Sequence, residues 1–199
     1  MKPPNPKNIA AANALQETLT SLLDETDRGS VVLAVAWLDE ALSKVINKAL
    51  VPTPNNKELL LKPGQPIGDM GTKIILAYRL GLIPKNLVES LNLCRKLRND
   101  FAHIASNLSF STPSIIDRVS VLFQQNEDLI TTMGNVLIDS NTYIHLNNPE
   151  GITIKNMLKE FGTKRLFQFT CGFLCAALAM LECETTQLTE RVAPTQLQL

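Results

Sequence analysis

The sequence has few aromatic residues, no net charge and no C-x-x-C pair of cysteines. Phe, Trp and Tyr make up 5% of its 199 residues, whereas Leu, Ala, Lys and Asn are plentiful, and this composition favours helices over β-sandwiches. Nineteen Lys and Arg balance nineteen Asp and Glu, so no overall field draws the protein to nucleic acid or to an anionic membrane. A dedicated DNA-binding domain usually carries more positive charge.

The cysteine pattern is not typical of disulfides or of zinc sites. Cys94, Cys171, Cys175 and Cys183 contain no C-x-x-C pair, and all four lie in apolar, helix-like surroundings. Disulfide frameworks need short spacings in a small secreted chain, and zinc sites need clustered Cys and His. We therefore expect buried free thiols in a reducing cytoplasm, and neither a metal nor a cofactor.

The longest apolar segment, LFQFTCGFLCAALAML, covers residues 166–181. A membrane span needs about 20 residues, and this segment is shorter, follows Lys164 and Arg165 directly and is interrupted by Gln168. We interpret it as the central helix of a bundle. The N-terminus, MKPPNPKNIAAANAL, has three prolines where a signal peptide would need its apolar core. These features predict a cytoplasmic protein that does not associate with a membrane.

Helical periodicity recurs along the chain, and strand signals are almost absent. The clearest helix follows Thr26, where apolar residues recur in steps of four and three and predict one buried stripe. This stripe consists of Val31, Val35, Leu38, Leu42, Val45 and Ala49. Val32, Ile46 and Leu50 are expected to widen the buried side. The expected helices cover residues 10–25, 26–50, 68–83, 84–103, 109–125 and 164–184.

These patterns predict one all-α domain, a helical bundle of about six or seven helices. We place this domain at residues 8–187, between a disordered tail at 1–7 and a frayed tail at 188–199. The one place where a small hairpin could form is NNPEG, within residues 138–154.

The densest group of polar residues is RNDFAH, at the end of the expected helix 84–103. With about 100° per residue, Leu97 and Phe101 face the core, and Arg98 lies about 60° from the centre of that stripe. Asn99 and His103 are one turn apart and point away from the core. The polar residues are therefore divided between the rim of the bundle and its outer side.

Two interpretations of this group remain open from the residues alone. In the structural one, Arg98 forms a bidentate ion pair with Asp39, which occupies a similar rim position on the helix 26–50. In the catalytic one, Arg98, Asn99 and His103 gather at a dimer groove and act on a phosphodiester. There the arginine would hold the phosphate and the histidine would transfer protons. Two such sets related by dimer symmetry would suit catalysis better than one.

Three segments carry a resemblance to known proteins: DRGSVVLAVAWLDEAL at 27–42, GDMGTKIILAYRLGLIP at 68–84 and CRKLRNDFAH at 94–103. In their order and spacing they resemble the mannitol operon repressor family of bacterial proteins. The resemblance implies an all-helical domain, a cytoplasmic location and a role in transcriptional repression. The last segment also resembles the R-x(4–6)-H signature of HEPN (higher eukaryotes and prokaryotes nucleotide-binding) domains. Many HEPN domains cut RNA as dimers without a metal, and their signature would assign catalysis to Arg98, Asn99 and His103.

The two resemblances imply different functions. A repressor that reads an operator typically presents a helix with Arg, Lys, Asn or Gln facing one groove, and the sequence contains no convincing helix of this kind. We therefore expect a transcriptional regulator that acts through contacts with other regulatory proteins, with weak or indirect DNA association and no enzymatic activity. A homodimer is compatible with this expectation. The alternative is a HEPN-type ribonuclease or a degenerate relative, and only this alternative implies RNA as a partner.

Overall fold

The structure is a computed structural model of the full chain, and it describes residues 5–53, 59–103, 108–139 and 154–191. These residues form seven α-helices and no strand, so the predicted all-α class is confirmed. The expected hairpin around NNPEG lies outside the described residues. The helices are α1 (Pro6–Leu22), α2 (Asp27–Ala49), α3 (Met70–Arg79), α4 (Lys85–His103), α5 (Pro113–Gln124), α6 (Glu127–Asp139) and α7 (Ile154–Glu184).

Polar side chains set where several helices begin. Asn5 caps α1 by accepting a hydrogen bond from the Lys7 backbone N–H at 3.1 Å. Thr26 caps α2 in the same way, through the Gly29 N–H at 3.0 Å. The cap at Asn5 starts α1 at Pro6, so the first helix begins inside the segment 1–7 that we expected to be disordered.

The apolar stripe of α2 lies in the core, as predicted. All six of its residues are at most 3% exposed, and Ile46 is also fully buried. The prediction for Val32 is wrong, because its side chain is 42% exposed. Val32 lies next to Val31 in sequence, about 100° away around the helix, where no neighbouring helix covers it.

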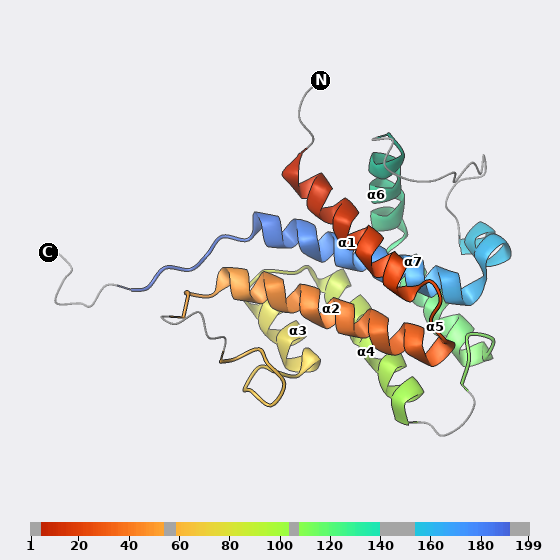
Figure 1. The fold of residues 1–199 in the computed structure, drawn as a ribbon, viewed down its shortest axis with the longest axis horizontal. Helices are drawn as coiled ribbons and strands as arrows, with labels where there is room; N and C mark the ends of the chain where they lie inside the picture. Colours follow the sequence, from red (N-terminus) through yellow and green to blue (C-terminus); the bar gives the residue numbers. More distant parts are fainter. Residues whose placement is uncertain (1–4, 54–58, 104–107, 140–153, 192–199) are drawn as a thin grey trace, which may run out of the picture.

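The last helix occupies the centre of the bundle. α7 packs against α1, α2 and α5, and Figure 1 shows α1 and α2 running along it. Its segment Phe161–Glu184 is long and apolar enough to span a membrane, but 61% of its most apolar window is buried within the fold. Leu166, Phe167, Leu174 and Leu178 are completely buried. The apolar run that we expected to be a central helix is therefore covered by neighbouring helices.

The helices α6 and α7, in the C-terminal half of the chain, differ from the expected helices. α6 was not expected as a separate element, and α7 begins ten residues before Lys164. The backbone at Gly162 has a φ of 73°, which only glycine adopts readily, and it turns α7 sharply between its two helical parts (Figure 1). The predicted last helix corresponds to the part that follows this turn.

The prediction that all four cysteines are buried requires one correction. Cys94, Cys171 and Cys175 are buried free thiols as expected, whereas Cys183 is exposed near the end of α7. The start of the expected frayed tail is held in place, because the Leu188 N–H donates a hydrogen bond of 2.8 Å to the Ala49 carbonyl at the end of α2.

Candidate functional site

The predicted RNDFAH site lies at the C-terminal end of α4. Arg98 and Asn99 are half-buried there, and Asp100 forms an ion pair with Arg118 of α5. His103 is the last residue of α4, and its side chain lies outside the described part of the chain. The catalytic grouping of Arg98, Asn99 and His103 therefore stays a hypothesis.

The predicted ion pair between Asp39 and Arg98 is wrong. Asp39 instead accepts hydrogen bonds from the Lys73 ammonium of α3, at 3.0 Å to Oδ1 and 2.8 Å to Oδ2. The rim position of Asp39 was correct, since its side chain is 33% exposed. However, α2 contacts both α3 and α4, and the flexible stem of Lys73 brings its charge to Asp39 from α3. Within the described residues, Arg98 makes no ion pair with Asp39.

The side of α3 that faces away from the core carries apolar side chains in solvent. Ile75 is 65% exposed and Tyr78 is 46% exposed, and they lie one turn apart. Arg79 is exposed beside them, and Arg95 of α4 approaches the start of α3, where a Cβ on Gly71 would lie 3.5 Å from its Cζ. We call the surface formed by Ile75, Tyr78, Arg79 and Arg95 the α3 outer face.

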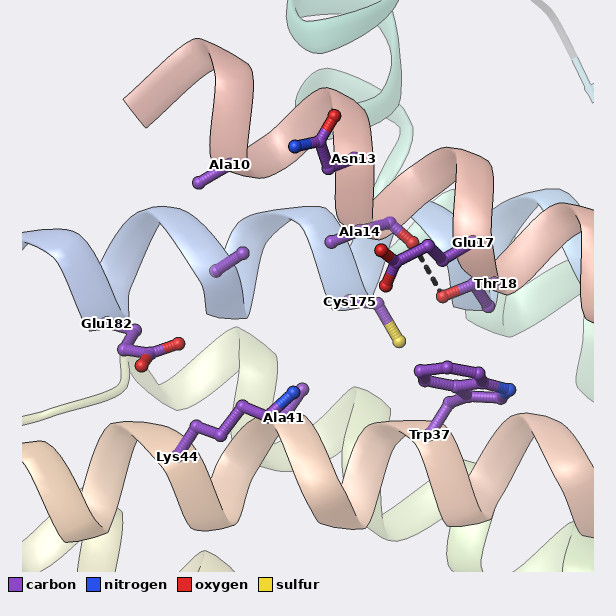
Figure 2. Close-up of a pocket in the computed structure, with 11 residues that line it drawn as sticks. Ala10, Asn13, Ala14, Glu17, Thr18, Trp37, Ala41, Lys44, Cys175 and Glu182 are labelled. Atoms are coloured by element: carbon purple, nitrogen blue, oxygen red, sulfur yellow. Dashed lines mark hydrogen bonds between the residues drawn. The ribbon is translucent and has the colours of Figure 1, made fainter. Parts of the chain in front are cut away.

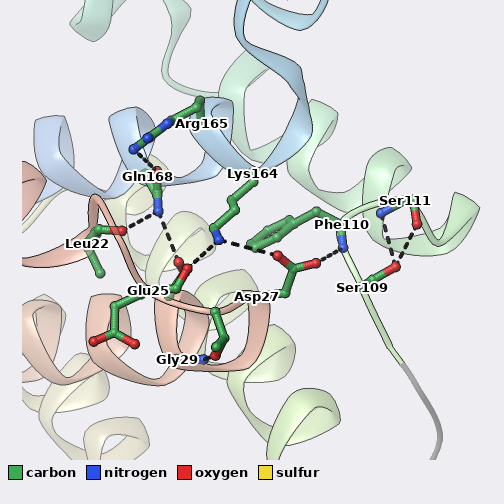
Figure 3. Close-up of polar contacts among 12 residues, drawn as sticks. Leu22, Glu25, Asp27, Gly29, Ser109, Phe110, Ser111, Lys164, Arg165 and Gln168 are labelled. Carbon is green, nitrogen blue, oxygen red and sulfur yellow. Dashed lines mark hydrogen bonds and ion pairs between the residues drawn. The ribbon is translucent and has the colours of Figure 1, made fainter.

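A polar network joins the turn between α1 and α2 to α7 (Figure 3). Lys164 lies 3.5 Å from the Asp27 carboxylate, and Asp27 accepts a 3.0 Å hydrogen bond from the Phe110 backbone N–H. Gln168 is 1% exposed and donates to the Leu22 carbonyl at 2.6 Å. The groups of this network bond to one another within the protein, so the network holds α7, the turn between α1 and α2, and the segment around Phe110 together.

A pocket of about 200 Å³ lies where α1, α2 and α7 meet (Figure 2). Small side chains and a single large ring form most of its wall, and charged residues stand at its edge. Its lining residues are Ala10, Asn13, Ala14, Glu17, Thr18, Trp37, Ala41, Lys44, Cys175, Ala179 and Glu182. We call it the Trp37 pocket. Sequence analysis did not identify it, because its residues come from three helices that are distant in the chain and form no local motif.

The thiol of Cys175 points from α7 toward the Trp37 ring (Figure 2). Burial raises the pKa of Cys175 to about 12, so this group remains a neutral thiol at physiological pH. The inner wall of the pocket is therefore uncharged. Within the described residues, no group of three or more His, Cys, Asp and Glu could hold a metal ion.

Comparison with known proteins identifies a similar fold. No protein-family model and no curated protein matches the chain. Among solved structures, the chain is similar to MtlR in the X-ray structure of the MtlR–HPr complex from Escherichia coli. The match has 19% sequence identity and a TM-score of 0.51, and it covers 86% of this chain and 98% of the other. The chain therefore has the MtlR-like fold that the resemblance to the mannitol operon repressor family implied.

Proposed function

We propose that this protein is a transcriptional regulator that acts by binding other proteins, without enzymatic activity of its own. The similar fold supports this proposal, because MtlR was solved as a complex with another protein, HPr. The family resemblance directs the proposal toward control of a mannitol operon in the cytoplasm. HPr is accordingly the first partner to test.

The observation in this chain that carries the proposal is the α3 outer face. Ile75 and Tyr78 expose large apolar surfaces on a short helix, and the guanidinium of Arg95 lies at one end of this stripe. The Arg95 Nε is buried and has no hydrogen-bond partner among the described residues. Tyr and Arg are enriched in protein interfaces, where a partner covers the apolar area and supplies acceptors to the arginine.

The test is a calorimetric titration of the purified protein with HPr from the same organism. If the α3 outer face forms the interface, Ile75→Asp should weaken binding at least about tenfold, because it places a charge in an apolar contact. Val121→Asp on α5 is the matched control, since Val121 is also an exposed apolar residue, at 44%. Absence of HPr binding, together with unchanged mannitol operon expression in a deletion strain, would contradict the proposal.

A HEPN-type ribonuclease is the second candidate function. One observation favours it: the half-buried Arg98 forms no ion pair with any described residue, so its guanidinium remains available for a phosphate. Adjacent Asn99 is half-buried as well. This candidate requires His103 to complete the site, and a cleavage assay distinguishes it from the protein-binding regulator.

A further inference from the structure

We propose that the Trp37 pocket binds a small organic cation, a primary amine attached to a ring or to a short apolar chain. This inference concerns a different surface from the α3 outer face and does not depend on the regulatory function proposed above. It rests on three properties of the pocket: its size, its neutral inner wall and the unpaired acids at its edge.

The size follows from the small residues that three helices present to one another. Ala14 on α1, Ala41 on α2 and Ala179 on α7 line the same space, and their methyl groups cannot fill it. The resulting volume is about 200 Å³. An apolar cavity of about 150 Å³ is enough for one benzene molecule, so a single ring with a short chain fits here.

The inner wall can contact an apolar body without losing hydrogen bonds. Trp37 supplies a large half-buried ring, and the neutral Cys175 thiol lies beside it (Figure 2). The Trp37 Nε1 atom is buried and has no hydrogen-bond partner among the described residues, which is uncommon for a buried indole. The indole N–H is a donor and an ammonium has no acceptor, so the Trp37 ring contributes its apolar face to this site and not a hydrogen bond.

Two carboxylates and one ammonium line the edge of the pocket, so the charges of the lining sum to one negative charge. The side-chain carboxylates of Glu17 on α1 and Glu182 on α7 accept no hydrogen bond and form no ion pair among the residues that the structure describes. Lys44 is the one cation in the lining, and it lies 3.0 Å from the Glu40 carboxylate, one turn away on α2. Glu17 and Glu182 lie toward opposite ends of the pocket (Figure 2), so both attract a cation by charge, and a cation over the Trp37 ring gains cation–π contact as well.

These charges decide between the classes of ligand. An anion would be repelled by Glu17 and Glu182, and a neutral ring would leave both carboxylates without a partner. A cationic amine with an apolar body fits the wall and the edge together. A lysine side chain from a protein partner has similar chemistry, so the experiment must separate it from a free small molecule.

Trp37 is the only tryptophan in the chain, so its fluorescence reports directly on the pocket. The probe is 2-phenylethylamine, with neutral 2-phenylethanol and anionic 3-phenylpropanoate as controls of similar size. We expect a saturable change of Trp37 emission with the amine, with a Kd on the order of 1 mM for so small a ligand. The alcohol should bind about tenfold more weakly, because it lacks the charge, and the anion should not bind.

Variants locate the binding to this pocket. Glu17→Gln and Glu182→Gln should each weaken amine binding about three- to fivefold, as expected for partly exposed charges. Glu89→Gln is the matched control, an exposed carboxylate on α4 outside the pocket lining, and should leave binding unchanged. Ala41→Leu should fill the pocket and abolish binding, while circular dichroism verifies that the helices remain.

Three results would overturn the inference. The first is no saturation with the amine at about ten times the expected Kd. The second is equal binding of amine, alcohol and anion. The third is tighter binding of Nα-acetyl-lysine amide than of 2-phenylethylamine, which would assign the pocket to a partner's side chain. None of these outcomes bears on HPr binding, so the two proposals can fail independently.

Discussion

The ammonium of Lys73 is nearly buried, and it donates hydrogen bonds to both carboxylate oxygens of Asp39, at 3.0 and 2.8 Å. The side chain of Lys73 is 3% exposed and that of Asp39 is 33% exposed. Because of this difference in burial, the loss of Asp39 should destabilise the protein more than the loss of Lys73. Without Asp39, a charge would remain in the interior with no counterion, whereas without Lys73 the carboxylate could still be solvated.

The first prediction follows from the difference in burial between Lys73 and Asp39. Asp39→Ala should lower the free energy of unfolding by about 2–4 kcal/mol, somewhat less than the loss from a fully buried pair. Lys73→Met keeps the apolar stem and removes the buried charge, so it should cost only about 1 kcal/mol. Urea denaturation of both variants measures the difference. Glu40→Gln, in the exposed pair with Lys44, is the control and should cost at most about 1 kcal/mol. Equal losses for the two variants would contradict this account.

The second prediction tests the core stripe of α2. Leu42 is completely buried, so Leu42→Ala should destabilise the protein by about 2–5 kcal/mol through lost apolar contacts and a cavity. Val32→Ala on the same helix should cost less than about 0.5 kcal/mol, because Val32 is exposed. Thermal or urea unfolding of the pair provides the measurement. A cost below about 0.5 kcal/mol for Leu42→Ala would show that the stripe is not part of the core.

The buried face of α2 that contains Leu42 and the exposed face that contains Val32 show what the sequence can predict. Periodicity correctly identified the buried stripe of α2 and the central position of α7, because both depend on the spacing of apolar residues along one helix. It also placed Asp39 on the rim of α2. The identity of the partner was beyond this reasoning, since helical angles do not reveal whether α3 or α4 supplies the nearer charge.

The Trp37 pocket was even harder to predict, because helical periodicity does not reveal which helices pack against one another. Its residues belong to α1, α2 and α7, and each of them looks ordinary within its own helix. Alanine at Ala14, Ala41 or Ala179 is typical of any helix, and only the packing of the three helices turns them into a cavity. Packing distances between distant segments are set by the whole fold, so no local pattern could have predicted the pocket.

The third prediction concerns the contact between α1 and α7. Gly172 lets the two helices approach closely, because a Cβ at this position would lie 2.8 Å from Cδ1 of the buried Leu15. Gly172→Val should therefore destabilise the protein by about 1–3 kcal/mol through overpacking. In a Leu15→Ala background the added cost should fall, since the smaller side chain leaves room. Additive losses in a double-mutant cycle would disprove the close contact.

The fourth prediction addresses the ribonuclease alternative. We expect no metal-independent cleavage of single-stranded RNA by the purified protein in EDTA, because the proposed function is not enzymatic. Gel analysis of a labelled RNA measures this. Cleavage that disappears in both Arg98→Ala and His103→Ala, with unchanged circular dichroism, would reverse the ranking of the two functions. Cleavage that persists in both variants would indicate a contaminating nuclease. Lys96→Ala, which removes an exposed cation from α4 outside the hypothetical site, is the matched control.

The last prediction is that the purified protein alone does not bind operator DNA tightly. Affinity for DNA comes largely from neutralised phosphates and released counterions, and this chain has a formal net charge of zero. At least six of its nineteen Lys and Arg already pair with carboxylates in the structure. These are Lys7, Lys44, Lys73, Lys85, Arg118 and Lys164.

The best basic cluster outside these pairs is Arg95 and Lys96 on α4, and Arg95 is half-buried beside Gly71 of α3. A homodimer would double the charges of both signs and leave the balance unchanged. We therefore expect weak, non-specific binding, with a Kd on the order of 10⁻⁴–10⁻⁶ M at physiological salt. Fluorescence anisotropy on labelled promoter fragments at two salt concentrations measures it. Nanomolar, sequence-selective binding by the protein alone would make it a direct repressor. Contacts to base edges would then provide the affinity and specificity that its net charge does not provide.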